Sequence, residues 1–582
     1  MNKHLYILLF FLVSLSASAQ TFILKGTVKE ANGTPLLGAT VVVKESNTGT
    51  SSDIEGHFSI KAQVGQTLEV SYVGMKTQRF KIKGESLQIV LKEEAQALEG
   101  VVVTGYQKIQ NRVFTGAAAS VKMDNIKMEG VADISRMLEG RVAGLSIQNV
   151  TGSFGSAPRI NIRGGASIIG NVQPLWVIDG AIYEDLVPLS LDQLVSGDAV
   201  TLVSSAIAGL NATDIEDIQV LKDASATSMY GARALNGVIV ITTKSGKRDT
   251  PNRITYSYEQ SFRTIPSYKD FDLLNSQETM SLLQEMNSKG YFNLQNTLYG
   301  RRSGIYYQWY KGVSTINPNT GNYYYPNTPA AQAAFMKERE YANTDWFKHL
   351  FSINPIRSHT ITFSGGGKNS TSYASLGYYH DSGWTITDNV KRITANLKNT
   401  FYINDQLKAT FTAVGNLRNQ KAPGTFAQRK NTAIGAFERD FDINPFSYAL
   451  GTSRTLRPKD ANCNLEYYRN NWAPFNILEE YRNNYMKIDV LDFKIQAEAS
   501  YKLNPHLEVT ALVSARQAQT QSSHYITENS NVIKAFRANE TPQVANDNIY
   551  LLKNKDNPLA PPQIALTNGG IFNKTETSLK SY

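Results

Sequence analysis

The chain has 582 residues, which is too long for one small domain and indicates roughly three or four domains. Its hydrophobic fraction is 41%, its mean hydropathy is −0.30, and it contains no internal run of about 20 apolar residues, which excludes an apolar transmembrane helix. The net charge of +9 comes without a basic helix, a zinc-finger spacing or an aromatic RNA-binding signature, so nucleic acid is not an expected partner. The single cysteine, Cys463, excludes an intrachain disulfide and a cysteine-based zinc site.

The first segment, residues 1–19, is predicted to be a signal peptide. Lys3 and His4 form a short basic region, an apolar run follows, and the small residues Ala17-Ser18-Ala19 suit cleavage before Gln20. A membrane anchor is the alternative, but the apolar run is too short for it. The mature chain is therefore expected to be exported. If it lies in a membrane without apolar helices, it must form a β-barrel, because only helices and closed barrels satisfy backbone groups in lipid.

Residues 22–94 are predicted to form a small β-sandwich. FILKGTVKE, GATVVVKE, HFSIKA, QTLEVSYVG, QRFKIKG and LQIVLKE read as short alternating strands separated by turn signals, about seven strands in all. His57 lies on one of these strands without a nearby histidine, so a metal-ligand role is not expected.

The stretch LEGVVVTGYQ, residues 98–107, forms a border between two differently composed regions. Val101, Val102 and Val103 have high β propensity but lack a neighbouring strand in the sequence. Such a ribbon offers unpaired backbone groups, which the sheet edge of another protein can take up by β-augmentation. The alternatives are a linker or the last strand of the sandwich.

Residues 108–247 are predicted to form a mixed α/β domain. A short helix is expected near residues 133–139, with Asp133 as its N-cap and Gly140 close to its end. RINIRGG, PLWVIDG, DIEDIQVLKDA and GVIVITTKSG read as strands, and SATSMYGARA as a short helix or turn. Gly164, Gly165 and Gly231 are expected in tight turns. A phosphate-binding loop at residues 163–165 is the alternative, but no P-loop lysine or GxGxxG pattern follows.

From residue 251 onward the chain alternates apolar and polar residues over long runs. RITYSYEQSFRT and LDFKIQAEASYK each place their apolar residues on one face, and they are long enough to cross an outer membrane at a tilt. A soluble antiparallel sandwich would alternate similarly. Connection lengths favour the barrel, because the short turns GGGKNS, INDQ and LNPH alternate with long connections near 266–357, 420–488 and 520–572. About seven strands are expected, with an eighth beginning near Thr575.

Two blocks resemble known families. GTV…NGTPLLGATVVVKE…GTSSDIEGHFSI is similar to the carboxypeptidase regulatory-like domain, a transthyretin-like sandwich. RGGASI, PLWVIDG and LNATDIEDIQVLKDASATSMYGARALNGVIVITTKSG resemble the plug domain of the SusC/RagA family of TonB-linked outer-membrane proteins. The resemblance implies a mainly β chain, in the order signal peptide (1–19), sandwich (22–94), TonB box (98–107), mixed α/β plug (108–247) and the first strands of a transmembrane antiparallel β-barrel (251–582).

The resemblance also implies site residues and partners. TonB, acting with ExbB and ExbD, would pair with the box residues Val101, Val102, Val103, Thr104 and Gly105 and pull the plug loose. The plug motif residues are Arg163, Gly164, Gly165, Asp179, Gly180, Lys222, Asp223, Tyr230 and Gly231. The other implied partners are a SusD-like surface lipoprotein, outer-membrane lipid and a glycan or peptide substrate, and the implied location is the outer membrane of a Gram-negative bacterium. No metal, cofactor or catalytic residue is implied.

The family's barrels have about twenty-two strands, whereas seven or eight strands leave no room for a plug. The sequence is therefore expected to be an incomplete barrel, a fragment or a truncated reading frame, that would not insert stably by itself.

Aromatic residues gather in the first long connection, among them Tyr306, Tyr307, Trp309 and Tyr310. They are candidates for substrate contact, and the alternative is that they pack the connection or contact a lid protein.

The expected function is active import of a large nutrient. The alternative is a surface receptor that signals or adheres without transport. No HExxH or GxSxG motif occurs, so an enzyme is not expected. The sequence does not identify the substrate.

Overall fold

The computed structural model describes residues 21–581, except 31–32, 47, 73–74, 76, 92–100, 104–107, 111–115, 132, 149–157, 163–172, 185–206, 319, 425–427, 432–435, 442, 505–506, 555, 558–559 and 566–567. The predicted signal peptide lies outside the described residues. The chain divides into two compact units, with the boundary at Val101 and with Gln110–Val113 assigned to the first unit. Among the described residues, no helix is both long and apolar enough to cross a membrane.

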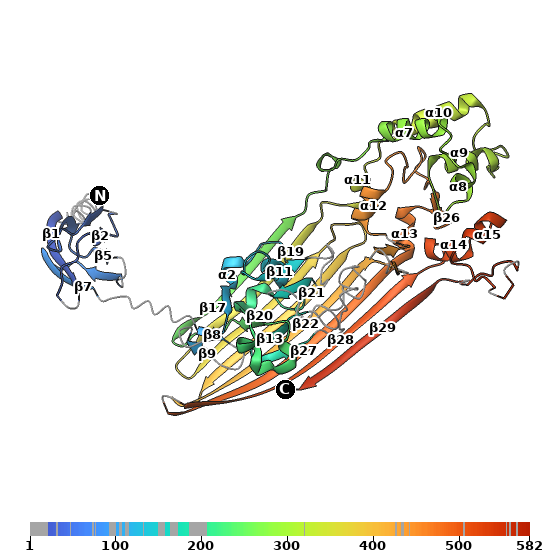
Figure 1. The fold of residues 1–582 in the computed structure, drawn as a ribbon. Coiled ribbons are helices and arrows are strands. Elements are labelled where there is room, and N and C mark those ends of the chain that lie inside the picture. The colour runs from blue at the N-terminus through green and yellow to red at the C-terminus, as the bar shows by residue number, and fades with distance from the viewer. Residues whose placement is uncertain are drawn as a thin grey trace, which may run out of the picture. The chain divides into compact units, whose positions relative to one another are not determined.

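The first unit is the predicted β-sandwich, with seven strands in two sheets (Figure 1). The first sheet has the order β4 (His57–Gln63), β1 (Thr21–Glu30), β7 (Ser86–Leu91), and the second has the order β3 (Thr48–Ser51), β2 (Thr40–Val43), β5 (Thr67–Ser71), β6 (Gln78–Lys81). In β4 the side chains of Phe58 and Ile60 are buried while their neighbours His57 and Ser59 are exposed, as expected for a strand with one face on the core.

The valine ribbon forms β8 (Val101–Val103), which pairs with β9 (Lys108–Gln110) in a two-stranded sheet. The prediction that this ribbon lacks a neighbouring strand is therefore wrong, because β9 follows it closely enough in the chain to pair with it. The alternative that it is the last strand of the sandwich is not met either, since β8 belongs to neither sandwich sheet. Thr104 and Gly105 lie outside the described residues.

The plug has a five-stranded sheet and several short helices. The sheet has the order β10 (Ala118–Lys122), β15 (Ile215–Leu221), β16 (Val238–Thr243), β13 (Leu175–Ile178), β14 (Ala181–Tyr183), and a second pair joins β11 (Leu145–Gln148) to β12 (Arg159–Ile162). The helices are α2 (Met123–Ile126), α3 (Ile134–Met137), η1 (Ala212–Asp214), α6 (Ala224–Thr227) and η2 (Ser228–Ala234). The predicted helix near 133–139 is α3, and its N-cap Asp133 accepts a hydrogen bond from the Ser135 N–H at 2.9 Å.

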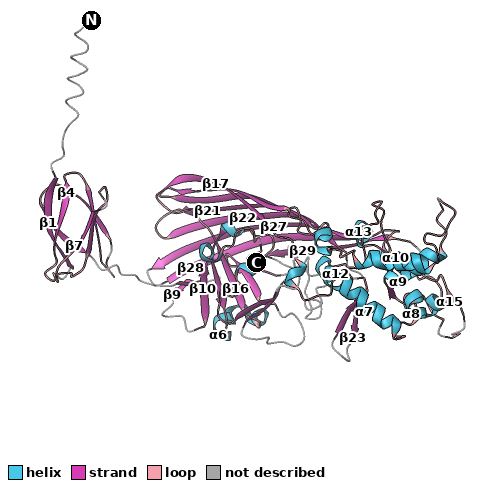
Figure 2. Cartoon of the chain, turned by 90° about the horizontal axis from the view of Figure 1, so that it is seen from above, coloured by secondary structure: helices cyan, strands magenta, loops and turns pink. Residues whose placement is uncertain are grey.

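Eight antiparallel strands form one curved sheet, called the wall here, and the plug lies against its concave face (Figures 1 and 2). In sheet order the strands are β17 (Thr250–Phe262), β19 (Pro355–Gly366), β20 (Ser370–Asp381), β21 (Asn389–Tyr402), β22 (Leu407–Pro423), β27 (Asn484–Asn504), β28 (Leu507–Ile526) and β29 (Gly570–Ser581). This matches the predicted seven strands and an eighth, although the eighth begins five residues earlier than Thr575.

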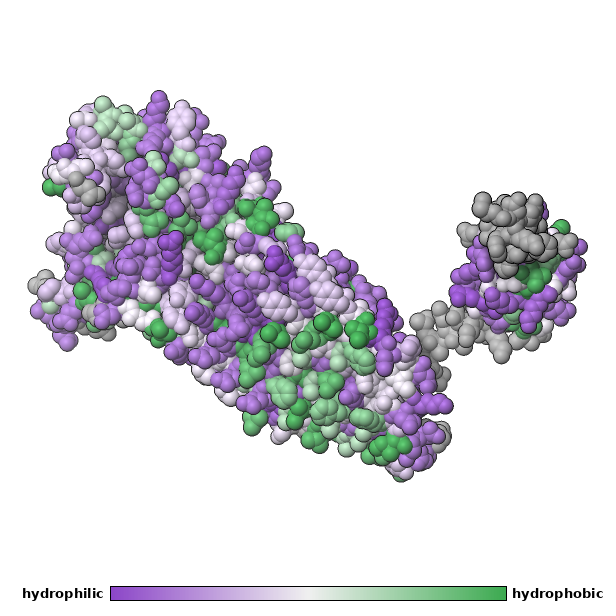
Figure 3. Space-filling model, turned by 180° about the vertical axis from the view of Figure 1, so that it is seen from behind, coloured by the Kyte–Doolittle hydropathy of each residue, from purple (hydrophilic) through white to green (hydrophobic). Residues whose placement is uncertain are grey.

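The wall exposes its apolar face and buries its polar face, whereas a strand of a soluble sandwich does the reverse. On β27 the apolar side chains of Leu491, Phe493 and Ile495 are exposed, while the polar side chains of Lys494 and Gln496 are 1% and 4% exposed. Hydrophobic residues accordingly gather on the outward face of the sheet (Figure 3). Apolar residues on the outside and polar residues against the plug are typical of a membrane barrel wall.

The long connections at one end of the wall fold together into a helical layer, defined here as the described residues within 263–354, 424–483 and 527–569 (Figure 2). Its helices are η3 (Tyr268–Asp270), α7 (Ser276–Ser288), α8 (Leu294–Tyr299), α9 (Ile305–Ser314), α10 (Pro329–Glu340), α11 (Trp346–Leu350), α12 (Pro445–Gly451), α13 (Ile477–Asn483), α14 (Asn531–Arg537) and α15 (Pro542–Asp547). Its short strands are β18 (Arg302–Ser303), β23 (Gln428–Asn431), β24 (Ala436–Arg439), β25 (Tyr468–Asn470) and β26 (Ala473–Phe475). The opposite end carries the short turns.

Candidate functional site: the contact between the plug and the wall

The Asp179-Gly180 turn of the plug is the centre of the contact with the wall. The two residues join β13 to β14, with Ile178 paired to Ala181, and both have positive φ, 50° and 84°. An Asp-Gly pair suits such a two-residue turn because aspartate tolerates the left-handed region and glycine adopts it without steric cost. The turn thereby places the Asp179 carboxylate beside Thr243 of β16, whose N–H and hydroxyl donate to it at 3.0 and 2.5 Å.

Three wall side chains hold this turn from two strands. Lys398 of β21 donates to the Asp179 carboxylate at 3.1 Å. Lys494 of β27 donates to the carbonyl oxygen of Ile178 at 3.2 Å, and Gln496 of β27 donates to the carbonyl oxygen of Asp179 at 2.7 Å. The wall thus contacts both the charge and the backbone of the turn.

The Asp179 carboxyl group is ionised in this setting. Burial by itself would raise its pKa, but the ammonium groups of Lys398 and Lys494 and the donors of Thr243 outweigh burial and lower the pKa to about 2. An ionised carboxylate facing two cations in a buried site makes the contact strong only while all partners stay in place.

A second contact lies beside the first, at the end of β14. Arg516 of β28 stacks over the ring of Tyr183 at 4.0 Å and donates to the carbonyl oxygen of Glu184 at 3.2 Å. Asp492 of β27 holds the same guanidinium with two hydrogen bonds, at 3.0 and 2.8 Å. The Glu184 carboxylate also pairs with Lys580 of β29. The far edge of the plug sheet is therefore tied to three consecutive wall strands.

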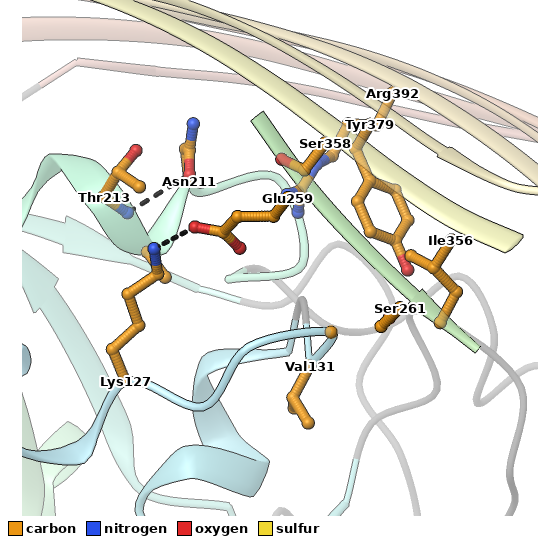
Figure 4. Close-up of a pocket in the computed structure, with 12 residues that line it drawn as sticks. Lys127, Val131, Asn211, Thr213, Glu259, Ser261, Ile356, Ser358, Tyr379 and Arg392 are labelled. Atoms are coloured by element: carbon orange, nitrogen blue, oxygen red, sulfur yellow. Dashed lines mark hydrogen bonds and ion pairs between the residues drawn. The ribbon is translucent and has the colours of Figure 1, made fainter. Parts of the chain in front are cut away.

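A third contact surrounds a cavity of about 30 Å³ between the plug and strands β17, β19, β20 and β21 (Figure 4). Lys127, which follows α2, forms an ion pair with Glu259 of β17 across this cavity. At Gly130 the backbones approach closely, since a Cβ there would lie 2.8 Å from Ser261 Cβ. Arg392 of β21, also in the lining, donates to the carbonyl oxygen of Ala208 at 2.8 Å.

The remaining predicted plug residues serve the fold of the plug itself. Asp223 is the N-cap of α6, accepting the Ala226 N–H at 2.9 Å, and its second oxygen accepts the Ala117 N–H at 2.7 Å. Lys222 donates to the carbonyl oxygen of Ala143 at 2.6 Å, and Tyr230 is buried in the plug core. Gly231 has φ 62° and ψ −150°, as a turn glycine should. Arg163, Gly164 and Gly165 lie outside the described residues.

The four aromatic candidates of the first long connection lie on α9. Tyr307 is 8% exposed and Trp309 is 3% exposed, and the Trp309 ring stacks on Tyr325 with centroids 5.8 Å apart. Tyr306 and Tyr310 are partly buried against the same core. The burial of Tyr307 and Trp309 agrees with the packing alternative for these two residues.

Sequence reasoning missed the wall residues that hold the plug. These residues are Lys398, Lys494 and Arg516. Each occupies a polar position in a strand that alternates polar and apolar residues, and the alternation alone indicates only that the side chain faces away from lipid. A lysine or arginine in the middle of such a strand is costly to bury without a partner, so its presence is a signal that a partner exists.

Comparison with known proteins places the chain in a family. Residues 24–103 match the CarboxypepD_reg-like domain family, and residues 110–238 match the TonB-dependent receptor plug domain family. The chain is 30% identical over 515 residues to the TonB-dependent receptor SusC of Bacteroides thetaiotaomicron, covering 87% of this chain and 45% of that protein. It is 29% identical over 473 residues to the TonB-dependent receptor P26 of Formosa agariphila, covering 78% of this chain and 41% of that protein.

Among solved structures, the RagAB peptide importer in the "open-open" state matches with a TM-score of 0.52 and 24% identity, covering 74% of this chain and 44% of that chain. The "closed-closed" state matches with a TM-score of 0.50 and 23% identity, covering 72% and 42%. This likeness concerns the fold. The chain spans less than half the length of these relatives. With its regulatory-like sandwich, its plug and its wall of eight antiparallel strands, the chain belongs to the SusC/RagA family of TonB-linked outer-membrane proteins.

Proposed function

We infer that this chain is part of an outer-membrane importer in which TonB, driven by ExbB and ExbD, grips β8 and pulls the plug away from the wall. The substrate would be a large nutrient, a glycan or an oligopeptide, and a SusD-like surface lipoprotein would close over the barrel that takes it up. The observation that carries the proposal is the Asp179 turn, which the wall holds through a few directional contacts rather than through a continuous apolar interface. Pulling breaks such contacts one after another, and each reforms when the pull ends.

The position and character of β8 support the TonB part of the proposal. Its three valines lie just before the plug, and their only described sheet partner is the three-residue strand β9. An isolated two-stranded pair is marginally stable in water, so another protein's strand can replace β9 at small cost. Residues 101–105, Thr104 and Gly105 included, are proposed as the segment that TonB holds.

The substrate class and the lipoprotein partner rest on relatives alone. One solved relative is named a peptide importer, which supports an oligopeptide as one of the two substrate classes.

Val102→Pro tests the proposal, with Val102→Thr as the matched control. Proline removes the backbone donor that strand pairing needs, whereas threonine keeps both the donor and the β propensity. Energised uptake of a labelled substrate should be lost in Val102→Pro and kept in Val102→Thr, and substrate binding at the cell surface should be equal in both. Normal uptake by the proline variant would overturn the proposal, and surface binding without any TonB-dependent uptake in the wild type would favour a signalling or adhesion receptor.

A further inference from the structure

The outward face of the wall changes from apolar to basic at the end that carries the helical layer. Strand register places Arg357, His380, Lys391, Asn419 and Asp489 in one row across β19, β20, β21, β22 and β27. The next row toward the helical layer contains Asn389, Lys421, Lys487 and Ser523. Paired residues point to the same side of a sheet, and the exposed side chains of Arg357, Lys391 and Lys487 identify that side as the outward one. The four cations Arg357, Lys391, Lys421 and Lys487 are called the basic band here.

The basic band has little acidic compensation. Within these two rows Asp489 is the one acidic side chain, and it accepts a hydrogen bond from Asn419 at 2.6 Å. None of the four cations forms an ion pair with another of the described residues. Four neighbouring positive charges on an open surface attract a polyanion and repel one another without it.

Aromatic rings support the two lysines nearest the helical layer. Tyr485 and Tyr525 stack with centroids 4.9 Å apart, and the ammonium groups of Lys421 and Lys487 lie over them at 4.4 and 5.1 Å. These contacts keep both ammonium groups close to the wall instead of extended into solvent.

The band lies at the boundary of the apolar surface. On β27 the outward positions from Leu491 to Tyr501 carry no basic side chain, and ten residues span about 33 Å along a strand, or about 25 Å across a membrane at the usual tilt. That height equals the apolar belt of an outer-membrane barrel, so Lys487 and its neighbours lie at the level of lipid head groups. Because long connections face the exterior in such barrels, this is the head-group level of the surface leaflet.

We propose that the basic band binds the phosphorylated head group of a surface-leaflet glycolipid. This inference rests on the outer-membrane location in the proposed function. Phosphate accepts hydrogen bonds from Arg357 and attracts the three lysines, while the acyl chains of the same lipid lie along the apolar rows below. Charge complementarity and the depth of the band select a membrane-held anion over a free one.

The test compares two fourfold variants of the complete importer of which this chain is proposed to be part, isolated from outer membranes in mild detergent. One replaces the basic band, R357Q/K391Q/K421Q/K487Q, and the other removes four exposed lysines of the helical layer, K269Q/K311Q/K337Q/K459Q, so that net charge changes equally. Native mass spectrometry counts the diphosphorylated lipid A molecules bound to the wild type and to each variant. Dephosphorylated lipid A is added as a competitor for the same binding site. A K421Q/K487Q variant is prepared in parallel in case the fourfold band variant does not fold.

The band variant should retain at least threefold less diphosphorylated lipid A than the wild type, while the helical-layer variant should match the wild type. Equal retention by both variants, or equal retention of phosphorylated and dephosphorylated lipid by the wild type, would overturn the inference. Absence of the complete importer, of which this chain is proposed to be part, from the outer-membrane fraction would instead overturn the proposed function, so the two failures are distinguishable.

Discussion

Lys398 Nζ on the wall lies 3.1 Å from Asp179 Oδ1 in the plug, although 219 residues separate the two in the sequence. Asp179 belongs to the plug motif that the sequence identifies, whereas no sequence motif marks Lys398.

Asp179→Asn should loosen the plug. It leaves the buried ammonium groups of Lys398 and Lys494 without their carboxylate, and loss of one partner of a buried ion pair typically costs at least about 3 kcal/mol. Hydrogen exchange of the β13–β14 amides should accelerate on the order of 100-fold. Asp124→Asn is the matched control, because its pair with Lys244 is solvent-exposed and worth under about 1 kcal/mol. Equal exchange in both variants would contradict the role given to Asp179.

Gly130→Ala should destabilise the plug–wall contact more than Gly140→Ala destabilises the plug. Both glycines have positive φ, 76° and 69°, so both substitutions carry the same backbone strain of about 1 kcal/mol. Only at Gly130 does the new Cβ meet the wall, at Ser261, whereas Gly140 has open space around it. We expect an additional loss of about 1–2 kcal/mol for Gly130→Ala by hydrogen exchange of residues 123–131.

Ser261→Gly in the Gly130→Ala background provides the internal control, because it removes the atoms that the new Cβ meets. It should restore most of the additional loss and leave the Gly140→Ala variant unchanged. A lack of rescue would show that the strain lies within the plug alone.

The helical layer should lose stability as pH rises between about 4.5 and 7. Burial raises the pKa of Glu480 to about 7, with hydrogen bonds from the Asn531 N–H and the Asn484 amide acting in the opposite direction. The Glu480 carboxyl has a pKa of about 7 in the folded state and about 4.5 in the unfolded state. Between these two values the folded state keeps a proton that the unfolded state has released, so stability is greatest below pH 4.5 and falls until about pH 7. The total change is about 3 kcal/mol.

Glu480→Gln should flatten that pH profile in thermal unfolding, and Glu479→Gln should preserve it. The neighbouring Glu479 carboxylate pairs with Lys534 and is partly exposed. Its charge affects the Glu480 pKa less than burial and the two hydrogen bonds do, and its removal leaves all three in place. An unchanged slope in Glu480→Gln would assign the pH dependence to another group.

Trp309→Ala should weaken the helical layer by about 3–5 kcal/mol, the usual cost of emptying a buried aromatic site. Tyr324→Ala, which removes a ring that is 51% exposed in the same connection, should cost under about 1 kcal/mol. Limited proteolysis of residues 263–354 measures the difference. Equal resistance of the two variants would show that Trp309 contributes no more to packing than an exposed ring.

Local pattern was sufficient to predict the strands of the wall and most of the plug. Alternation in residues 255–262 and 491–501 separates exposed apolar side chains from less exposed polar ones, with Gln260 the exception. Asp133 is recognisable as a helix N-cap because capping depends on neighbours two or three residues away. The short turns and long connections likewise follow from turn residues and chain length.

Long-range contacts could not be predicted from pattern. Which wall cation meets Asp179 depends on the register of β21 and β27 against a separately folded plug, and period-2 alternation carries no such information. The helices of the long connections were not predicted, because their apolar residues are shared among three segments distant in sequence. The pairing of β8 with β9 was missed because β9 has only three residues and a polar composition.

The most direct test of the central claim, that force at β8 separates the plug from the wall, is the accessibility of the wall beneath the plug. Thr412 is 1% exposed and lies in register between Lys398 and Gln496, so Thr412→Cys in a Cys463→Ser background places a thiol at the contact. In energised cells a membrane-impermeant thiol reagent should label this cysteine when TonB is present, and labelling should disappear when Val102→Pro is added. Labelling that is equal with and without Val102→Pro would contradict the account.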